Sequence, residues 1–174
     1  MLRSHGITKD TSLMSKKDGP WYYEMKELGF NYRITDFQCA LGLSQLKKLG
    51  KFLKKRKEIA KIYDYGFRDN SMFVIPKVNK GCSHAYHLYP LQINFEKKNQ
   101  KKKFFKEFLK KKINLQVHYI PIHFQPYYKK RYGFKAGDYP VTERFYRREV
   151  SLPIFYSLKK KDINKVIKLI INFC

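Results

Sequence analysis

The chain has 174 residues, of which 43% are hydrophobic and 17% aromatic, and its formal net charge is +24. A chain of this length can bury a core, and so apolar a composition excludes an intrinsically disordered protein. The three cysteines, Cys39, Cys82 and Cys174, are odd in number and far apart, which excludes a disulfide framework or a paired-cysteine metal site. We expect a cytoplasmic protein with no membrane partner, because neither a signal peptide nor a long apolar run is visible.

The positive charge comes from 38 Lys and Arg residues against 14 Asp and Glu residues. Taken alone, this excess suggests a polyanion partner. The lysines are spread over most predicted helical faces, however, and no zinc finger, RNA-recognition signature or Gly-X-X-Gly loop accompanies them. We therefore expect no nucleic-acid partner, and a basic module that binds nucleic acid or another polyanion is kept as the alternative.

The first third of the chain predicts a loop, an aromatic segment and two helices. Residues 7–20 are polar and predict the loop. The aromatic residues at 21–23 predict a short strand or an anchor against the core. Thr35 or Asp36 predicts a helix N-cap, and Gly50 predicts the break before a second helical run.

Asn31 and Arg33 lie just before the predicted helix start. Helix N-termini favour anions, so these two side chains could meet a phosphate or a carboxylate. In the alternative interpretation Asn31 shapes a turn and Arg33 pairs with Asp36. The local sequence does not separate the two.

The second half predicts strands that alternate with helices. Residues 72–76 predict an edge strand, and residues 83–94 predict a stronger strand whose Pro90 favours an edge or a bulge. Residues 97–112 predict an amphipathic helix with a solvated lysine face.

Two further helices, at 141–149 and 161–173, flank a short strand at 150–155 that is stopped by Pro153. This order predicts an α+β domain with helices against one face of a small sheet.

The segment at 116–128 combines an alternating strand with a stiffened loop. Pro121 and Pro126 prevent the strand from continuing as a ladder or passing into a helix. Two imidazoles, two amides and three phenols are thus held on a rigid backbone, which is typical of a ligand rim. The alternative is an aromatic edge strand and turn in water. No carboxylate or thiolate stands at useful spacing from His118 and His123, so no metal site is predicted.

Several long motifs in this order resemble the DegT/DnrJ/EryC1/StrS family of sugar aminotransferases, and in particular its pseudaminic acid branch. The similarity covers essentially the whole chain. The motifs are LRSHGI at 2–7, GPWYYE at 19–24, GFNYRITDFQCALGLSQL at 29–46, HLY at 87–89, QVHYIPIH at 116–123, QPYY at 125–128 and SLPI at 151–154.

The resemblance implies a homodimeric enzyme of the aspartate aminotransferase fold (fold type I) that uses pyridoxal 5′-phosphate (PLP). Its active sites would lie at the subunit interface. Glutamate would supply an amino group to the 4-keto carbon of a UDP-linked 6-deoxy sugar, in nucleotide-sugar and pseudaminic acid biosynthesis.

The resemblance also implies the residues that contact substrate. Asn31 would reach the neighbouring site close to the cofactor phosphate or the substrate, with Arg33 assisting. The residues that would line the nucleotide-sugar site are Gln116, Val117, His118 and Tyr119, with His123 and Tyr127 as further candidates beside them.

One departure from the family pattern limits this expectation. In the family, a Ser-x-x-Lys stretch before the Arg-Ser-His-Gly segment carries the lysine that binds PLP covalently, and no lysine of this chain stands in that motif. We therefore expect no catalytic residue here, no covalently held PLP and no transamination by the chain alone.

The expected division is a remnant and joining loop at 1–34, connecting helices at 35–68 and a small C-terminal α+β domain at 69–174. In this interpretation the partner is a missing amino-terminal half or a second subunit. A non-catalytic interaction fragment is the remaining alternative.

Overall fold

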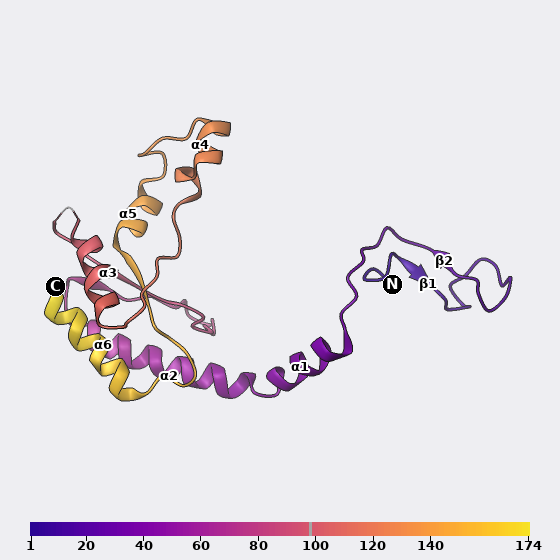
Figure 1. Cartoon of the computed structure of the whole chain (residues 1–174), viewed down its shortest axis with the longest axis horizontal. Helices are drawn as coiled ribbons and strands as arrows, with labels where there is room; N and C mark the ends of the chain where they lie inside the picture. Colours follow the sequence, from indigo (N-terminus) through magenta and orange to yellow (C-terminus); the bar gives the residue numbers. More distant parts are fainter. Residues whose placement is uncertain (98) are drawn as a thin grey trace. The chain divides into compact units, whose positions relative to one another are not determined.

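A computed structural model describes residues 1–97 and 99–174. Their contacts group the chain into two compact units, Met1–Lys48 and Leu49–Cys174 (Figure 1). The three-part division expected from the sequence, with boundaries after residues 34 and 68, stays a prediction. Each unit is described by itself below.

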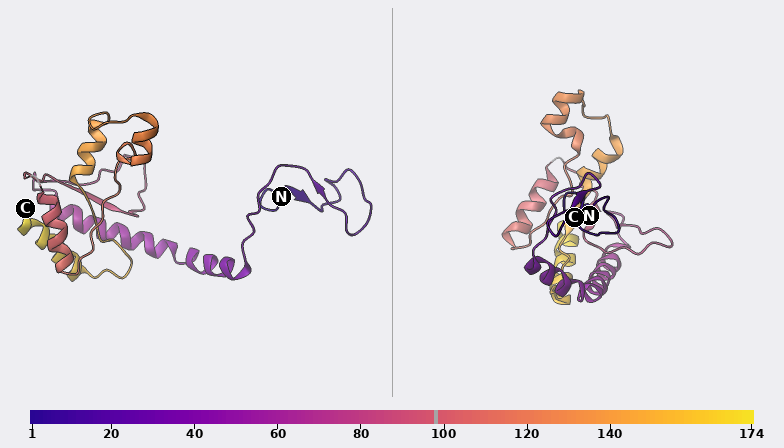
Figure 2. Two further views of the ribbon diagram at one scale, coloured as in Figure 1. Left: turned by 45° about the horizontal axis from the view of Figure 1, so that its top comes forward. Right: turned by 90° about the vertical axis from the view of Figure 1, so that its right-hand side faces the viewer.

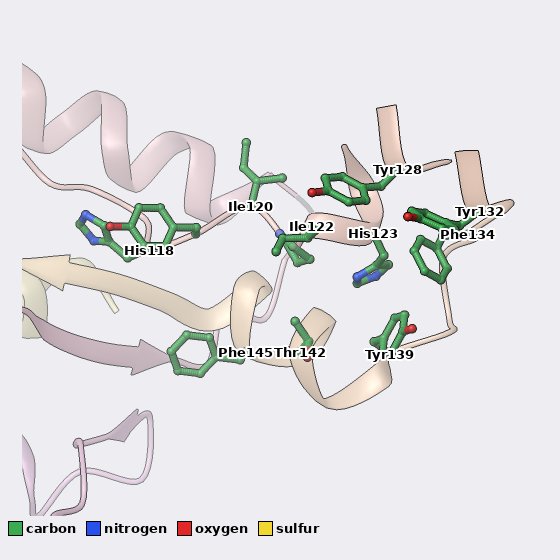
Figure 3. A pocket seen from close by; sticks show the side chains of 12 residues that line it. His118, Ile120, Ile122, His123, Tyr128, Tyr132, Phe134, Tyr139, Thr142 and Phe145 are labelled. Atoms are coloured by element: carbon green, nitrogen blue, oxygen red, sulfur yellow. The ribbon is translucent and has the colours of Figure 1, made fainter. Parts of the chain in front are cut away.

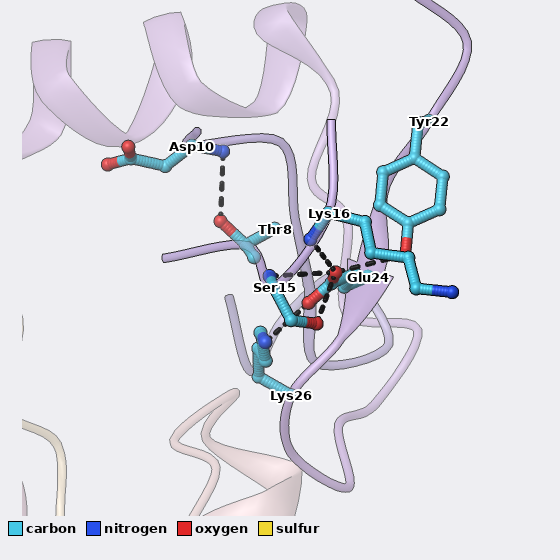
Figure 4. A network of polar contacts seen from close by, with 7 residues as sticks. All are labelled: Thr8, Asp10, Ser15, Lys16, Tyr22, Glu24 and Lys26. Carbon is cyan, nitrogen blue, oxygen red and sulfur yellow. Dashed lines mark hydrogen bonds and ion pairs between the residues drawn. The ribbon is translucent and has the colours of Figure 1, made fainter. Parts of the chain in front are cut away.

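The first unit is built around a short antiparallel pair, in which β1 (Ile7–Thr8) faces β2 (Glu24–Met25). The Glu24 carboxylate accepts hydrogen bonds from the Ser15 N–H at 2.8 Å and hydroxyl at 2.6 Å, from the Lys16 N–H at 3.0 Å and from the Tyr22 hydroxyl at 3.0 Å, and it pairs with Lys26 (Figure 4). The bonds from Lys26 and then Ser15 lower the pKa of Glu24. One carboxylate therefore fastens the loop between the two strands.

Two glycines allow the backbone of the first unit to cross itself. The Phe30 N–H donates to the Leu2 carbonyl at 2.7 Å, and the His5 N–H donates to the Phe30 carbonyl at 2.9 Å. A Cβ on Gly29 would lie 2.1 Å from the Gly6 nitrogen, and Gly6 itself has a φ of 69°. Only glycine fits such an approach without moving the backbone.

The helix α1 (Asp36–Leu46) confirms the predicted N-cap. Thr35 and Gln38 form a capping box, in which each side chain bonds the other's backbone. None of the residues of α1 is buried.

The aromatic anchor predicted at 21–23 is wrong. Trp21 is 73% exposed and Tyr23 is 53% exposed, and both precede β2 rather than forming a strand. The physical reason is that Met1–Lys48 has no apolar core to receive them, since its buried residues are Gly6 and Thr8.

The second unit is the α+β arrangement that the sequence predicts. Its antiparallel sheet has the order β3 (Phe73–Val74), β4 (Tyr89–Ile93), β5 (Glu149–Leu152). The helices α2 (Leu49–Phe67), α3 (Gln100–Lys110) and α6 (Lys160–Phe173) supply most of the rest of the core, and α6 lies alongside α2 (Figures 1 and 2). The fully buried core side chains include Ile59, Tyr63, Phe67, Tyr89, Leu91, Ile93, Phe104, Val150, Ile163 and Ile170.

Most helix and strand predictions in this unit are confirmed within a few residues, but the strand predicted at 83–94 begins only at Tyr89. Tyr89, Leu91 and Ile93 are buried while Pro90 and Gln92 are half-buried, so β4 alternates as expected. The helix predicted at 97–112 is α3, and its residue 98 lies outside the described residues.

The placement of Pro90 on an edge strand is wrong, because β4 is the central strand. Ser151 opposes Pro90 but exchanges both of its backbone hydrogen bonds with Gln116 on its other side. The proline nitrogen therefore faces the β3 side of the sheet. There β3 pairs with Gln92 and Ile93 and does not reach Pro90, so no ladder bond is lost.

The break between the first two helices also differs from the prediction. It falls at residues 47–48, and Gly50 lies inside α2. A Cβ on Gly50 would meet nothing within 4 Å, so neither a close approach nor an unusual backbone angle requires glycine there.

Gly29→Ala and Gly42→Ala form a matched pair of substitutions. We expect Gly29→Ala to force the Gly6 crossing apart and to abolish hydrogen-exchange protection of the His5 and Phe30 amides. Gly42 lies within α1 with nothing within 4 Å of its Cβ position, so Gly42→Ala should stabilise the helix by about 1 kcal/mol. Unchanged His5 and Phe30 exchange in Gly29→Ala would contradict the steric argument.

Candidate functional site

The segment at 116–128 begins beside β5, the outer strand of the sheet in the second unit. Gln116 forms an isolated bridge with Ser151, after which the chain passes into a 3-10 turn, η1 (Ile122–Phe124), and the helix α4 (Pro126–Tyr132). The alternating strand predicted from Gln116 onwards is wrong. The N–H of His118 leaves the ladder to bond a Glu149 carboxylate oxygen at 2.9 Å, and Tyr119 is 73% exposed. The prediction that Pro126 keeps the chain from passing into a helix is also wrong, because Pro126 is the first residue of α4, where a missing N–H costs no intrahelical hydrogen bond.

A polar chain holds His118 against the sheet. Its Nδ1 lies 2.8 Å from the Ser151 hydroxyl, which donates to the other Glu149 oxygen at 2.5 Å. Glu149 is fully buried and Ser151 is 5% exposed. Both residues belong to β5, so the sheet itself fixes the ring.

An aromatic groove with a volume of about 610 Å³ opens beside His118 (Figure 3). Its walls come from the loop after Gln116, from α4 and from the helix α5 (Pro140–Arg148). The groove is lined by His118, Tyr119, Ile120, Pro121, Ile122, His123, Tyr128, Tyr132, Phe134, Tyr139, Thr142 and Phe145. Such a surface suits a planar ring or another apolar group.

His123 is held at the groove by a carboxylate. Its Nε2 lies 3.0 Å from a Glu143 oxygen, and both side chains are buried. Glu143 also accepts the Gly137 N–H at 2.7 Å. The Gly137 bond lowers the pKa of Glu143, burial opposes the change, and the His123 bond adds to the lowering. The Glu143 contact therefore fixes the orientation of the His123 ring, which lines the groove.

The predicted substrate residues at 116–119 are divided among three cavities. Gln116 and His118 share a small cavity of about 240 Å³ with His87, Asn114 and Ser151. His118 and Tyr119 line the aromatic groove, and Val117 lines a third cavity, of about 580 Å³, beside Lys101.

Of the two further candidates, His123 lines the aromatic groove. Tyr127 is 62% exposed and accepts a hydrogen bond from Arg131 at 3.2 Å. Tyr127 does not line the groove.

Lys101 departs from the solvated lysine face that the sequence predicts. Its ammonium donates to the Tyr146 carbonyl at 2.6 Å and lies over the Tyr146 ring. Burial lowers the pKa of Lys101 to about 8, and the nearby Glu149 charge opposes this. No local signal distinguishes Lys101 from the lysines around it, because its burial depends on α5.

Asn31 and Arg33 lie together in the first unit. Asn31 forms an isolated bridge with Ser4, and the Arg33 Nε donates to the Asn31 side-chain oxygen at 3.2 Å. Arg33 therefore bonds Asn31 and not Asp36. Both side chains are exposed, and their remaining N–H groups suit an anion.

Comparison with known proteins assigns the family. The model of the DegT/DnrJ/EryC1/StrS aminotransferase family matches residues 1–171. The chain belongs to this family. It is 42% identical over 171 residues to the uncharacterized protein MJ1066 of Methanocaldococcus jannaschii, covering 98% of this chain and 44% of that one. It is 39% identical over 163 residues to the UDP-4-amino-4,6-dideoxy-N-acetyl-beta-L-altrosamine transaminase of Campylobacter jejuni, covering 93% and 40%.

Solved aminotransferases of this kind share the fold. Helicobacter pylori PseC, an aminotransferase involved in the biosynthesis of pseudoaminic acid, superposes with a TM-score of 0.79 at 31% identity, covering 99% of this chain and 44% of that one. The PLP form of the putative sugar aminotransferase Spr1654 from Streptococcus pneumoniae gives 0.81 at 26%, covering 99% and 41%. The chain thus has part of an aminotransferase fold and spans less than half the length of these relatives.

Two further properties concern the residues that the structure describes. None of their helices is long and apolar enough to cross a membrane. In residues 1–97 and 99–174 no group of three or more His, Cys, Asp or Glu side chains could hold a metal ion.

The lowered pKa of Glu143 predicts a pH-dependent contribution to stability. A carboxyl whose pKa is lower in the folded than in the unfolded chain stabilises fully above its ordinary value of 4.5, and this contribution is lost as the pH falls through the folded pKa. Glu143→Gln should remove that dependence, so its free energy of unfolding should fall less steeply below pH 4.5 than that of the wild type. Urea unfolding between pH 3 and pH 7 measures this.

Glu107→Gln is the matched control, because Glu107 is about half exposed and pairs only with Lys110 at 3.5 Å. Its acid profile should follow the wild type. Identical profiles for Glu143→Gln and the wild type would show that the buried pair does not contribute as argued.

Proposed function

We propose that this chain is the carboxy-terminal part of a PLP-dependent aminotransferase that moves an amino group from glutamate to the 4-keto carbon of a UDP-linked 6-deoxy sugar. The family match over residues 1–171 carries the proposal. The similarity to a UDP-sugar transaminase and to PseC supports the substrate class and a place in nucleotide-sugar metabolism such as pseudaminic acid biosynthesis. The alternative of a basic polyanion-binding module gains no support from these matches.

The side chains of this chain are suited to non-covalent contacts with PLP or a sugar nucleotide, but not to covalent attachment of PLP. Arg33 and Asn31 offer a charged and a neutral donor side by side, which suits a phosphate group. The family's lysine stretch precedes the Arg-Ser-His-Gly segment, whereas the Ser-x-x-Lys sequences of this chain, at 44–47 and 157–160, both follow it. PLP supplies the electron sink that makes amino-group transfer possible, and this chain supplies walls and hydrogen bonds around it.

The second unit would bind the sugar nucleotide. Gln116 and His118 offer polar contacts in one small cavity, and the adjoining aromatic groove offers stacking surfaces that exclude water. Proposed contacts therefore include Gln116, Val117, His118 and Tyr119, with His123 at the groove.

The first unit supports the need for a second polypeptide. Leu28 is 85% exposed, Phe37 is 80% exposed and Tyr32 is 71% exposed. Large apolar side chains left in water in one unit indicate a surface that another chain covers. Under this proposal the covering chain is a second subunit or an amino-terminal segment that carries the lysine.

Co-expression tests the activity. The chain alone should not convert glutamate and a UDP-4-keto-6-deoxy sugar, because it lacks the lysine motif. Co-expressed with the amino-terminal part of the Campylobacter jejuni transaminase, it should co-purify and yield 2-oxoglutarate and the amino sugar. Turnover by the chain alone would contradict the proposal, and so would co-purification without turnover.

Ligand titration tests the substrate class separately. UDP-N-acetylglucosamine should shift the amide NMR signals of Gln116, His118 and Tyr119 in the isolated chain. Gln116→Ala removes one polar contact from the small cavity and should weaken binding by about 1 kcal/mol, or fivefold. The control Gln45→Ala, on the exposed face of α1, should bind like the wild type. Equal weakening by both variants would disprove a specific role for Gln116.

A further inference from the structure

His118 is held by a polar chain whose proton positions can be deduced from chemistry. Both Glu149 oxygens are occupied, one by the His118 N–H at 2.9 Å and one by the Ser151 hydroxyl at 2.5 Å. A carboxylate only accepts hydrogen bonds. The Ser151 hydrogen must therefore point to Glu149.

This fixes the role of the next contact. With its hydrogen committed to Glu149, the Ser151 oxygen can only accept from the His118 Nδ1 at 2.8 Å. A neutral imidazole carries one hydrogen, and here it must sit on Nδ1. The other nitrogen, Nε2, then has a free lone pair. Within residues 1–97 and 99–174 no side chain or backbone group bonds that nitrogen.

The second imidazole of the segment is held the opposite way. His123 uses its Nε2 to reach Glu143 at 3.0 Å, so a carboxylate contacts the ring directly and the hydrogen sits on Nε2. The two rings therefore differ in tautomer, because His118 turns its Nδ1 and His123 its Nε2 towards the accepting oxygen.

We propose that Ser151 and Glu149 are positioning residues that hold neutral His118 as the Nδ1–H tautomer, so that its Nε2 accepts a hydrogen bond from a hydroxyl or ring N–H of the ligand. His118 lines both the small cavity with Gln116 and the aromatic groove. A phosphate dianion carries no donor, so it is not the partner of neutral His118. The ligand identity rests on the proposed function, whereas the tautomer does not.

The tautomer is read directly by ¹⁵N NMR of the full chain labelled at histidine, recorded at pH 8.5. The wild type should show His118 with its hydrogen on Nδ1. Ser151→Ala removes the acceptor, and the hydrogen should move to Nε2, the form that imidazole favours in water.

Glu149→Gln provides a variant of nearly equal volume. If its oxygen accepts from the His118 N–H, its NH₂ group faces Ser151 and donates to the hydroxyl. The hydroxyl then turns to donate to Nδ1, and His118 should again carry its hydrogen on Nε2. If Glu149 served only the stability of the fold, a folded Glu149→Gln variant would keep the His118 hydrogen on Nδ1.

His123 is the internal reference, because it should remain the Nε2–H form in every variant that is folded. Ser83→Ala is the matched control, since the exposed Ser83 hydroxyl accepts only from the Lys57 ammonium at 2.7 Å. It should leave the His118 signals unchanged. A wild type with the hydrogen on Nε2, or variants that keep it on Nδ1, would overturn the proposal.

The ligand half is tested with UDP-N-acetylglucosamine and inorganic phosphate. The former should shift the His118 Nε2 signal in the direction of hydrogen-bond acceptance, and the latter should not. An equal shift with phosphate overturns the donor assignment. No shift with UDP-N-acetylglucosamine overturns the ligand half and counts against the proposed substrate, while the tautomer result stands by itself.

Discussion

The burial of β5 on both faces is the constraint on which the second unit and its site depend. Val150 and Leu152 face the hydrophobic core, while Glu149 and Ser151 face the segment that starts at Gln116. A buried carboxylate is costly unless its oxygens receive hydrogen bonds, and removing one donor typically costs about 1–3 kcal/mol. The loop that carries His118 supplies one of the two donors. The same strand therefore links the stability of the core to the conformation of the site.

Different interactions stabilise the two units. The second unit encloses its own core between a sheet and three helices. The first unit is held by backbone crossings at Gly6 and Gly29 and by the many contacts of Glu24. It leaves Leu28, Phe37 and other large apolar residues in water. A segment held by polar contacts that exposes apolar side chains is typical of an interface. Those side chains stabilise the fold only when another protein surface covers them and removes them from water.

Periodic segments were predictable from the sequence, and irregular ones were not. The apolar stripe of α6 and the capping box of Thr35 are local patterns, so the helices were placed nearly to the residue. Residues 116–119 alternate like a strand, but the His118 N–H bonds a side chain 31 residues away. Glu149 is read as a polar residue at a helix end. Nothing within a few residues of it shows that a distant loop will bury it, and the same holds for Lys101.

The motif resemblance pointed to residues 116–119, which line three cavities, and it could do so because it does not depend on local conformation. It could not divide the roles within that segment, which follow from distances alone. His118 and His123 are each held by a glutamate of the stretch that includes α5 and β5, one through Ser151 and the other directly. In their neutral forms both rings direct a hydrogen into the protein and offer a lone pair on the other nitrogen. Under the proposed function, a neutral ring held in this way recognises a hydroxyl or ring N–H of the ligand rather than a phosphate.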